Sequence, residues 1–218
     1  MPGVASRRRK SWKQDPDRVR SNILQVARDV FAAHGLSGAR IEDIAARTDT
    51  SKRMIYYYFT DKEGLYRAVL EDTYAEMRKA EDALDLTSLP PGDALRRLVE
   101  FTFDHHRDAT AFVRLVMIEN IHGAAHMNQS DSIAGQNSSA ITLLEGIYRR
   151  GVEAGVFRSG LSALELHWHI SALCYFNVSN QNTFSRIFGD DLFQPGGQTR
   201  LRDQVAEAVV RLVAHAPR

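Results

Sequence analysis

Apolar residues recur at helical spacing along almost the whole of this 218-residue chain. Ile23, Ala27, Val30 and Phe31 fall at i, i+4, i+7 and i+8, which places them on one face of a helix. No segment longer than a few residues alternates apolar and polar residues, as a half-buried strand would. The spacing therefore predicts an all-α protein.

Caps and breaks divide the chain into about nine helices. The first is expected to start near Pro16 and to stop near Gly35. The motifs Thr60-Asp61-Lys62-Glu63 and Ser162-Ala163-Leu164-Glu165 match capping boxes, and Gly196-Gly197 is expected to separate the last two helices. The remaining helices are predicted at residues 40–47, 51–59, 61–84, 93–107, 110–121, 132–154, 162–184 and 198–214.

The composition is that of an ordinary globular protein, with 44% hydrophobic and 25% charged residues. Cys174 is the one cysteine, so no intrachain disulfide can form. No window approaches 18 uninterrupted apolar residues, and no apolar run follows the basic residues 7–10. We therefore expect a cytoplasmic protein with neither a membrane span nor a secretory signal.

The net charge of +1 conceals an asymmetry between the two ends of the chain. Residues 1–65 contain 13 Lys and Arg against 8 Asp and Glu, a net charge of +5. Residues 66–218 contain 15 against 19, a net charge of −4. This pattern is typical of a polyanion-binding module joined to a domain with a different task.

Two short predicted helices, at 40–47 and 51–59, are joined by the tight break Thr48-Asp49-Thr50 and form a candidate helix-turn-helix. The second helix of such a motif enters the DNA major groove, so it needs long polar side chains near its start. Lys52 and Arg53 meet this need. A solvated face with no DNA contact is the alternative interpretation of these two residues.

Aromatic and basic residues just beyond Arg53 add possible phosphate contacts. Tyr56, Tyr57 and Tyr58 carry hydroxyls that would reach phosphates, although packing in the core is the alternative for each ring. Lys62 falls in the first turn of the next helix, where a cation opposes the helix dipole unless an anion compensates.

The stretch FAAHGLSGARIEDIAARTDTSKRMIYYYFTDKEGLYRAVL, residues 31–70, resembles the DNA-binding domain of the TetR (tetracycline-repressor-like) family of bacterial transcription regulators. The resemblance covers roughly residues 18–70 and rests on F-x-x-x-G, D-I-A and Y-Y-Y-F-x-D-K-E-x-L at the family's spacing. It implies a homodimer that binds a palindromic DNA operator. It also implies that a small-molecule effector, bound in the C-terminal domain, releases the DNA.

Carried over by position, the resemblance implies that Lys52, Arg53 and Met54 face base edges and that Arg40 touches a phosphate. The family usually has Gly where this chain has Asp49, so a slightly strained turn is expected. Either Thr50 or Ser51 would cap the second helix. The full set of expected DNA-binding residues is Arg40, Thr50, Ser51, Lys52, Arg53, Met54, Tyr56, Tyr57, Tyr58 and Lys62.

We expect three parts along the chain: a disordered basic arm at 1–15, the helix-turn-helix domain at 16–62, and a helical ligand-binding and dimerisation domain at 63–218. The arm would either follow DNA phosphates or act only as a solubilising tail, and the sequence favours neither.

The predicted helix at 162–184 carries more polar and aromatic residues than a core helix usually does, so it is expected to line a ligand cavity or a dimer interface. For the candidates on earlier helices, core packing is the favoured alternative. The candidate ligand-binding residues are Phe103, Phe112, Met117, Tyr148, Trp168, His169, Tyr175, Phe176, Asn177 and Asn180.

In the family that this chain resembles, the last two long helices usually form a four-helix dimer bundle. The corresponding predicted helices are 162–184 and 198–214. The apolar face of the final helix, and hence the candidate dimer interface, comprises Leu201, Val205, Ala208, Val209 and Leu212.

Glu119, His122 and His126 fall at i, i+3 and i+7, which would place three possible metal ligands on one helix face. Gly123 and the polar run at 128–130 are expected to end that helix and to scatter the ligands. We therefore expect no metal and no cofactor.

The chain lacks a nucleophile elbow, a glycine-rich phosphate loop and an H-E-x-x-H motif, so an enzyme is not expected. The function predicted is that of a ligand-responsive transcriptional regulator, most simply a repressor. The alternative is a DNA-binding protein of the same fold without an effector, such as a nucleoid or division-associated factor.

Overall fold

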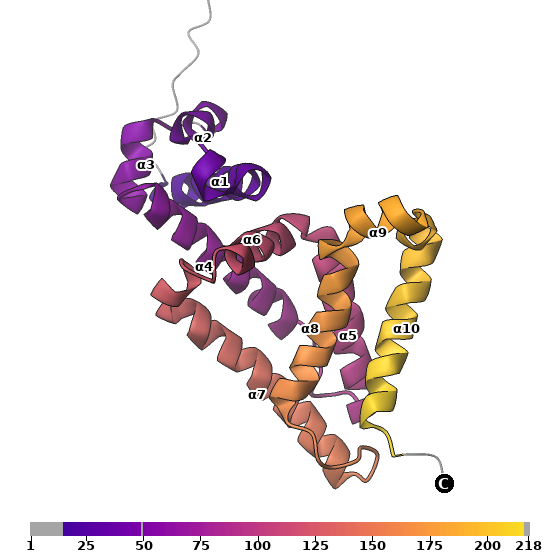
Figure 1. Ribbon diagram of the computed structural model, residues 1–218. Coiled ribbons are helices and arrows are strands. Elements are labelled where there is room, and N and C mark those ends of the chain that lie inside the picture. Colours follow the sequence, from indigo (N-terminus) through magenta and orange to yellow (C-terminus); the bar gives the residue numbers. More distant parts are fainter. Residues whose placement is uncertain (1–14, 49, 216–218) are drawn as a thin grey trace, which may run out of the picture. The chain divides into compact units, whose positions relative to one another are not determined.

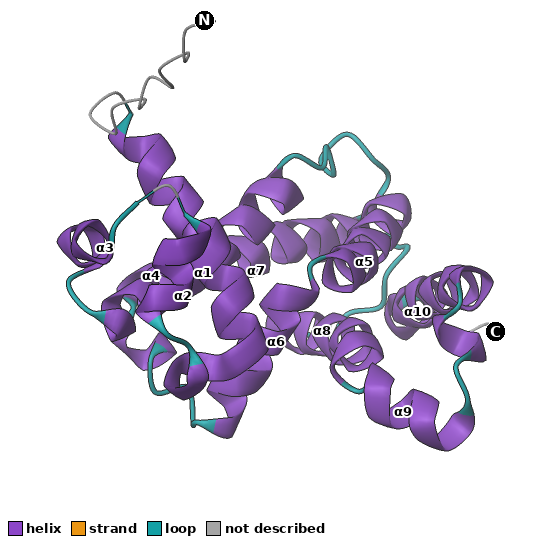
Figure 2. Ribbon diagram, turned by 90° about the horizontal axis from the view of Figure 1, so that it is seen from above, coloured by secondary structure: helices purple, strands orange, loops and turns teal. Residues whose placement is uncertain are grey.

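The computed structural model describes residues 15–48 and 50–215. Ten α-helices and two short 3-10 turns account for the regular structure of these residues, and no strand is present among them (Figure 2). An isolated bridge between Phe157 and Ala214 is the one β-type pairing there. The all-α prediction is confirmed. The expected basic arm at 1–15 lies, apart from Asp15, outside the described residues.

The chain forms two compact units that divide between Val69 and Leu70. This division falls inside helix α4 (Lys62–Asp82), whereas the boundary expected from the sequence, between residues 62 and 63, lies at the start of that helix. The first turns of α4 belong to the N-terminal unit because they supply part of its core. Tyr66 is fully buried there, and its ring meets that of Phe31 edge to face at 5.0 Å.

The N-terminal unit is built from α1 (Pro16–Gly38), α2 (Ile41–Arg47), α3 (Lys52–Phe59) and the start of α4 (Figure 1). Asp15 caps α1 by accepting a hydrogen bond from the Arg18 amide at 2.9 Å. Gly35 breaks the helix with φ 66° and ψ 177°, a left-handed conformation that glycine adopts without strain. The predicted start and stop therefore fall where expected, with one further helical turn after Gly35.

The turn between α3 and α4 differs from the predicted capping box. Thr60 does not cap α4, because its backbone is left-handed, with φ 68° and ψ −58°. Asp61 is the cap instead, and its Oδ1 accepts the Gly64 amide at 2.6 Å. The Asp61 amide donates to the Phe59 carbonyl at 2.7 Å, which makes Phe59–Asp61 a γ-turn. A Cβ at Gly64 would lie 2.2 Å from the Phe59 carbonyl oxygen, so this turn requires glycine there.

Thr60→Gly is expected to stabilise the N-terminal unit by about 1 kcal/mol. Left-handed backbone costs a β-branched residue about 1–3 kcal/mol, which glycine avoids. Glycine also raises the conformational entropy of the unfolded chain, and this offsets part of the gain in stability. Chemical denaturation measures the effect. Thr60→Ala, which keeps the strained backbone, is the matched control. An equal gain in both variants would contradict the explanation from φ.

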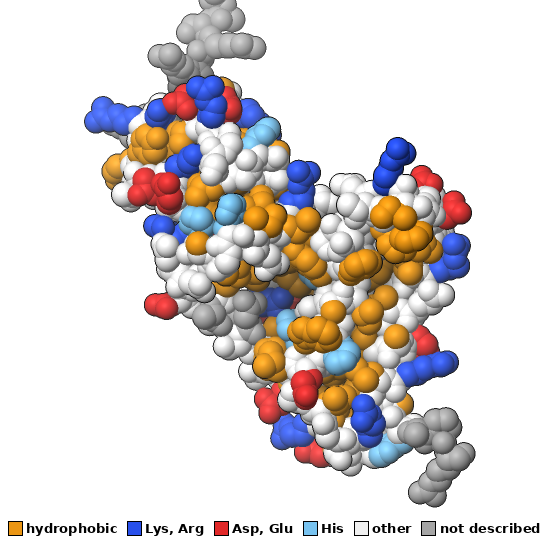
Figure 3. Space-filling view, viewed as in Figure 1, with side chains coloured by type: hydrophobic (Ala, Val, Ile, Leu, Met, Phe, Trp, Pro, Cys, Tyr) orange, Lys and Arg blue, Asp and Glu red, His pale blue; other side chains and the backbone are white. Residues whose placement is uncertain are grey.

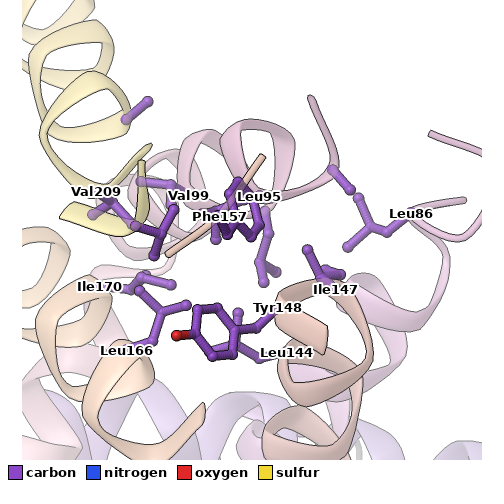
Figure 4. Close-up of a cluster of buried hydrophobic side chains, with 14 of the residues drawn as sticks. Leu86, Leu95, Val99, Leu144, Ile147, Tyr148, Phe157, Leu166, Ile170 and Val209 are labelled. Carbon is purple, nitrogen blue, oxygen red and sulfur yellow. The ribbon is translucent and has the colours of Figure 1, made fainter. Parts of the chain in front are cut away.

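The C-terminal unit contains the rest of α4 and six further helices: α5 (Pro91–Asp108), α6 (Thr110–Ile121), α7 (Asp131–Glu153), α8 (Ala163–Ser179), α9 (Gln181–Phe188) and α10 (Pro195–Val213). The 3-10 turns Met127–Gln129 and Asp191–Phe193 lie in the connections. Helix α5 packs against α7, α8 and α10 (Figure 1). Their shared core includes Leu95, Val99, Tyr148, Phe157 and Val209 (Figure 4).

The predicted helix at 162–184 is two helices, α8 and α9, which meet at Asn180. Its start is as predicted, since Ser162 and Glu165 form a reciprocal capping box. Gly196 and Gly197 do not separate helices but lie in the first turn of α10. Gly197 is needed there because the backbone of Asp191 lies too close for a side chain. A Cβ at residue 197 would lie 2.2 Å from the Asp191 carbonyl oxygen.

Candidate functional site

Helix α3 is positioned by a side-chain cap and by its apolar face. Ser51, rather than Thr50, is the cap, and its Oγ accepts the Met54 amide at 3.3 Å. Ile55 and Phe59 are buried, and α3 packs against α2. Asp49, for which the sequence predicted a strained turn, lies outside the described residues. The arrangement holds the first turn of α3 at the surface.

The exposed face of α3 carries the residues that the sequence assigned to DNA. Lys52 and Arg53 are both exposed, as the first two residues of the helix. Tyr57 is 78% exposed and Tyr56 37%. Met54 and Tyr58 are half-buried and join this face to the core side. Long polar side chains at a surface helix start are what major-groove recognition requires.

Lys52 is held by a partner that the sequence analysis did not single out. Its ammonium group forms an exposed ion pair with Glu42 of α2 and lies 5.8 Å from the centroid of the Tyr56 ring. This hydrogen bond raises the pKa of Lys52 and lowers the pKa of Glu42. Glu42 therefore orients a candidate DNA-contacting cation and partly neutralises it.

Glu42→Gln is expected to increase affinity for random-sequence duplex DNA. Released from its carboxylate, Lys52 gains a phosphate contact, and each such contact steepens the salt dependence by about 0.9 in log K against log [salt]. A salt titration of binding measures the slope. Asp43→Asn removes a charge from the same turn and is the matched control. Equal slopes in both variants would show that only net charge matters.

Two more predicted phosphate-contacting residues flank the motif. Arg40 is exposed and stands at the N-cap position of α2, without a capping side-chain bond. Lys62 is half-buried, and its Nζ donates to the Ala39 carbonyl at 3.2 Å. This bond ties the start of α4 to the end of α1, so Lys62 has a structural role that the sequence analysis missed.

The C-terminal unit contains a cavity of about 260 Å³ between α4, α5, α6 and α8. Figure 3 shows the surface hollowed between α7 and α8, with basic and histidine side chains visible there. Two of the ten predicted ligand-binding residues, Phe112 and Tyr175, line this cavity. Other lining residues were not predicted, namely Tyr74, Arg78, Glu81, His106 and His167.

Two of the unpredicted residues form a buried ion pair on one face of α4. Arg78 and Glu81 follow Tyr74 at i+4 and i+7, so they share one face of α4. Both are more than nine-tenths buried and form an ion pair. A charged pair on the inward face of a helix is unusual enough to mark a site.

The other predicted ligand-binding residues lie outside this cavity. Phe103 and Tyr148 are core residues, as the favoured alternative had it, and the Tyr148 hydroxyl donates to the Arg158 carbonyl at 2.7 Å. Asn177 is buried but paired with Gln198 at 2.9 and 3.0 Å. The rest are half-buried or exposed: Met117, His169 and Asn180 are half-buried, while Trp168 and Phe176 are 66% and 52% exposed.

Glu119 is buried and organises the connection after α6. Its Oε2 accepts the amides of His126 and Met127 at 3.1 and 3.2 Å, and its Oε1 lies 3.0 Å from His126 Nδ1. His122 has no part in these bonds. Across the described residues, no three His, Cys, Asp or Glu side chains are grouped so that they could hold a metal ion.

The predicted interface on α10 mostly faces inward. Val209 is 1% exposed in the protomer core, so its assignment to a dimer interface was wrong. Leu201, Val205 and Leu212 pack partly buried against the same core, and Ala208 is exposed. Six large apolar side chains that are exposed lie instead on α8 and α9 (Figure 3), while Ile121, Val156 and Leu192 are exposed elsewhere in this unit. The six are Leu164, Trp168, Leu173, Phe176, Ile187 and Phe188.

Both units match known families. Residues 23–69 match the family model described as bacterial regulatory proteins, tetR family, and residues 91–209 match the one described as tetracyclin repressor-like, C-terminal domain. The chain belongs to the TetR family. It is therefore a DNA-binding helix-turn-helix transcriptional regulator. No helix in the described parts of this TetR-family protein is long and apolar enough to cross a membrane.

Relatives that match most of the chain agree with its membership of the TetR family. The HTH-type transcriptional repressor NicS of Pseudomonas putida is 38% identical over 179 residues, 82% of this chain and 84% of NicS. A tetR-family regulatory protein from Rhodococcus RHA1 has the same fold, with a TM-score of 0.70 at 23% identity, over 91% of this chain and 98% of that one. The transcriptional regulator FadR of Bacillus subtilis, solved in complex with stearoyl-CoA, has a TM-score of 0.68 at 18% identity, over 87% of this chain and 97% of that one.

Proposed function

We propose that this TetR-family protein is a repressor that binds a palindromic operator as a homodimer and leaves the DNA when a small molecule enters the cavity of its C-terminal unit. The observation that carries the proposal is the exposed start of α3, where Lys52 and Arg53 stand free of the core within the segment matched to the family's DNA-binding domain. Repression is the function named for NicS, a relative along most of the chain.

The apolar face of α8 supports homodimerisation. Trp168 and Phe176 project from one helix at a spacing of eight residues, and each exposes more than half of its side chain. Exposed aromatic residues clustered in this way favour a protein interface. A second copy of the same face would cover them in a two-fold arrangement. A palindromic operator follows from such a dimer, because two-fold protein symmetry requires matching half-sites.

The cavity favours an effector-responsive regulator over a DNA-binding protein without an effector. It is lined by aromatic side chains and by several polar groups, which is the composition of a small-molecule site. The FadR structure with stearoyl-CoA provides an example of a ligand bound to a protein of this fold.

Selection from random duplex DNA tests the proposal, with Lys52→Ala/Arg53→Ala as the control protein. We expect a palindromic consensus for the natural protein and none for the control. The same weak, salt-sensitive binding by both proteins, without a consensus, would refute sequence-specific recognition through α3.

A further inference from the structure

The cavity of the C-terminal unit contains a buried cation whose hydrogen bonds are incomplete. Arg78 is 7% exposed and pairs with Glu81 through Nη1. Its Nε is buried and has no hydrogen-bond partner among the described residues. Guanidinium N–H groups are donors only, and buried donors in proteins are nearly always paired. Arg78 therefore lines the cavity with one of its strong donors unused.

A second buried polar atom lies on the same wall. His106 is 4% exposed, lines the cavity, and has no hydrogen-bond partner for its Nδ1 among the described residues. Burial lowers the pKa of His106 to about 4, so its ring is neutral near pH 7. A neutral imidazole nitrogen can pair with a hydroxyl or amide group. Arg78 and His106 thus offer a charged anchor and a neutral one.

Two charged side chains line the cavity, Arg78 and its ion-pair partner Glu81, and the unused hydrogen-bond donor belongs to the cation. Burial is the main cause that lowers the pKa of His105, His106 and His167. The positive charge of Arg78 lowers the pKa of all three further, so this charge reaches across the cavity. Burial raises the pKa of Glu81, because a buried carboxylate loses its hydration, and the charge of Arg78 opposes this shift. A cationic ligand would be repelled by Arg78, whereas a carboxylate would supply the acceptor that Nε lacks.

The size and walls of the cavity favour a small ring. Its volume of about 260 Å³ is below the range of about 300–1,000 Å³ that is usual for drug-sized ligands. Aromatic rings make up part of the cavity wall. The ring of Phe112 meets that of Tyr74 edge to face at 5.2 Å and stacks on that of His106 at 5.7 Å, measured between ring centroids. Such surfaces bind planar aromatic groups.

We propose that the cavity binds a small aromatic carboxylate, with the carboxylate on Arg78 and the ring against Tyr74 and Phe112. This inference rests on the proposed function of the cavity as the effector site. Glu81 holds Arg78 in place through their ion pair and competes with the ligand for it. Glu81 is therefore expected to set how tightly the ligand binds.

Calorimetry and thermal shift with three matched probes test the ligand class. We expect benzoate to bind and to raise the melting temperature, whereas benzamide, which is neutral, and benzylamine, which is cationic, bind at least about tenfold more weakly, because a charge-assisted hydrogen bond is lost. The three hydroxybenzoates are tested as further aromatic carboxylates. The proposal would be overturned if neither benzoate nor any hydroxybenzoate binds, or if benzamide binds as tightly as benzoate.

Variants of the ion pair give effects of opposite sign. Arg78→Met is expected to weaken benzoate binding about tenfold to hundredfold, and Glu81→Gln to strengthen it, because the competing anion is gone. A purely structural ion pair would make both variants weaker, which would refute the assignment. If Arg78→Met does not fold, Arg78→Met/Glu81→Gln leaves no unpaired buried charge and must still lose benzoate binding.

Operator binding, measured separately without any probe, distinguishes this proposal from the one it rests on. Loss of benzoate binding in the Arg78 variants, with operator binding intact, supports the ligand class alone. If benzoate binds through Arg78 but leaves the protein on its operator, the ligand class stands and effector release fails. If benzamide or benzylamine releases the operator and benzoate does not, release stands and the carboxylate proposal fails.

Discussion

Arg53→Ala is expected to reduce affinity for the selected operator by about 1–3 kcal/mol, because an arginine that bonds a guanine at two atoms loses both contacts at once. Arg53 is exposed at the second position of α3, where it is free to reach a base edge. Affinity for random DNA should fall much less. Titration of labelled operator and random duplexes at one fixed salt concentration measures both effects.

The control for this experiment is Arg47→Ala. Arg47 is also an exposed arginine of the helix-turn-helix, but it ends α2 and lies 3.6 Å from Asp29 in an ion pair. We expect it to leave the ratio of operator to random affinity unchanged. A loss for Arg53→Ala that is equal on both duplexes would show that Arg53 contacts only phosphate.

A pair of aspartate substitutions is expected to separate folding from assembly. Val209→Asp should destabilise the protomer by several kcal/mol, roughly 3–5 or more, because it buries a charge without a partner in a core position that is 1% exposed. Trp168→Asp should leave the fold intact, since Trp168 is 66% exposed, and should instead produce monomers. Denaturant unfolding and light scattering measure the two effects.

Operator binding provides the functional readout of the same pair. Monomers of Trp168→Asp should bind the palindromic operator far more weakly, because each contacts only one half-site. A Trp168→Asp protein that stays dimeric would place the interface elsewhere, with Ile187 and Phe188 of α9 as the next exposed apolar residues. A well-folded but monomeric Val209→Asp would contradict the burial seen here.

The helix-turn-helix was predictable in detail because its signals are local. The Ser51 cap, the apolar positions Ile55 and Phe59, and the exposed Lys52 and Arg53 follow from the spacing within one short segment. The capping box at Thr60 failed because two neighbouring residues could both cap α4. The γ-turn makes Asp61 the cap, and this turn is possible because Gly64 has no Cβ to clash with the Phe59 carbonyl oxygen.

The cavity of the C-terminal unit was only partly predictable because it is assembled from four helices. Tyr175 and Phe112 were found as aromatic residues on their own helices. Arg78 and Glu81 were not found, since a charged pair on a helix is usually solvated and only its neighbours on α5, α6 and α8 bury it. Val209 of α10 was misassigned because an apolar stripe does not reveal which partner covers it.

Periodicity, caps and one motif in the sequence were thus sufficient for the helical class, most helix boundaries and the exposure of Lys52 and Arg53 at the start of α3, because each depends on contacts within a few residues of chain. Which apolar stripe is covered and which is left for a partner, and which buried charge lacks a hydrogen bond, were decided only by tertiary packing. These properties depend on residues far apart in sequence. Val209 in the core, Trp168 at the surface and Arg78 in the cavity are the three positions where that packing made the difference.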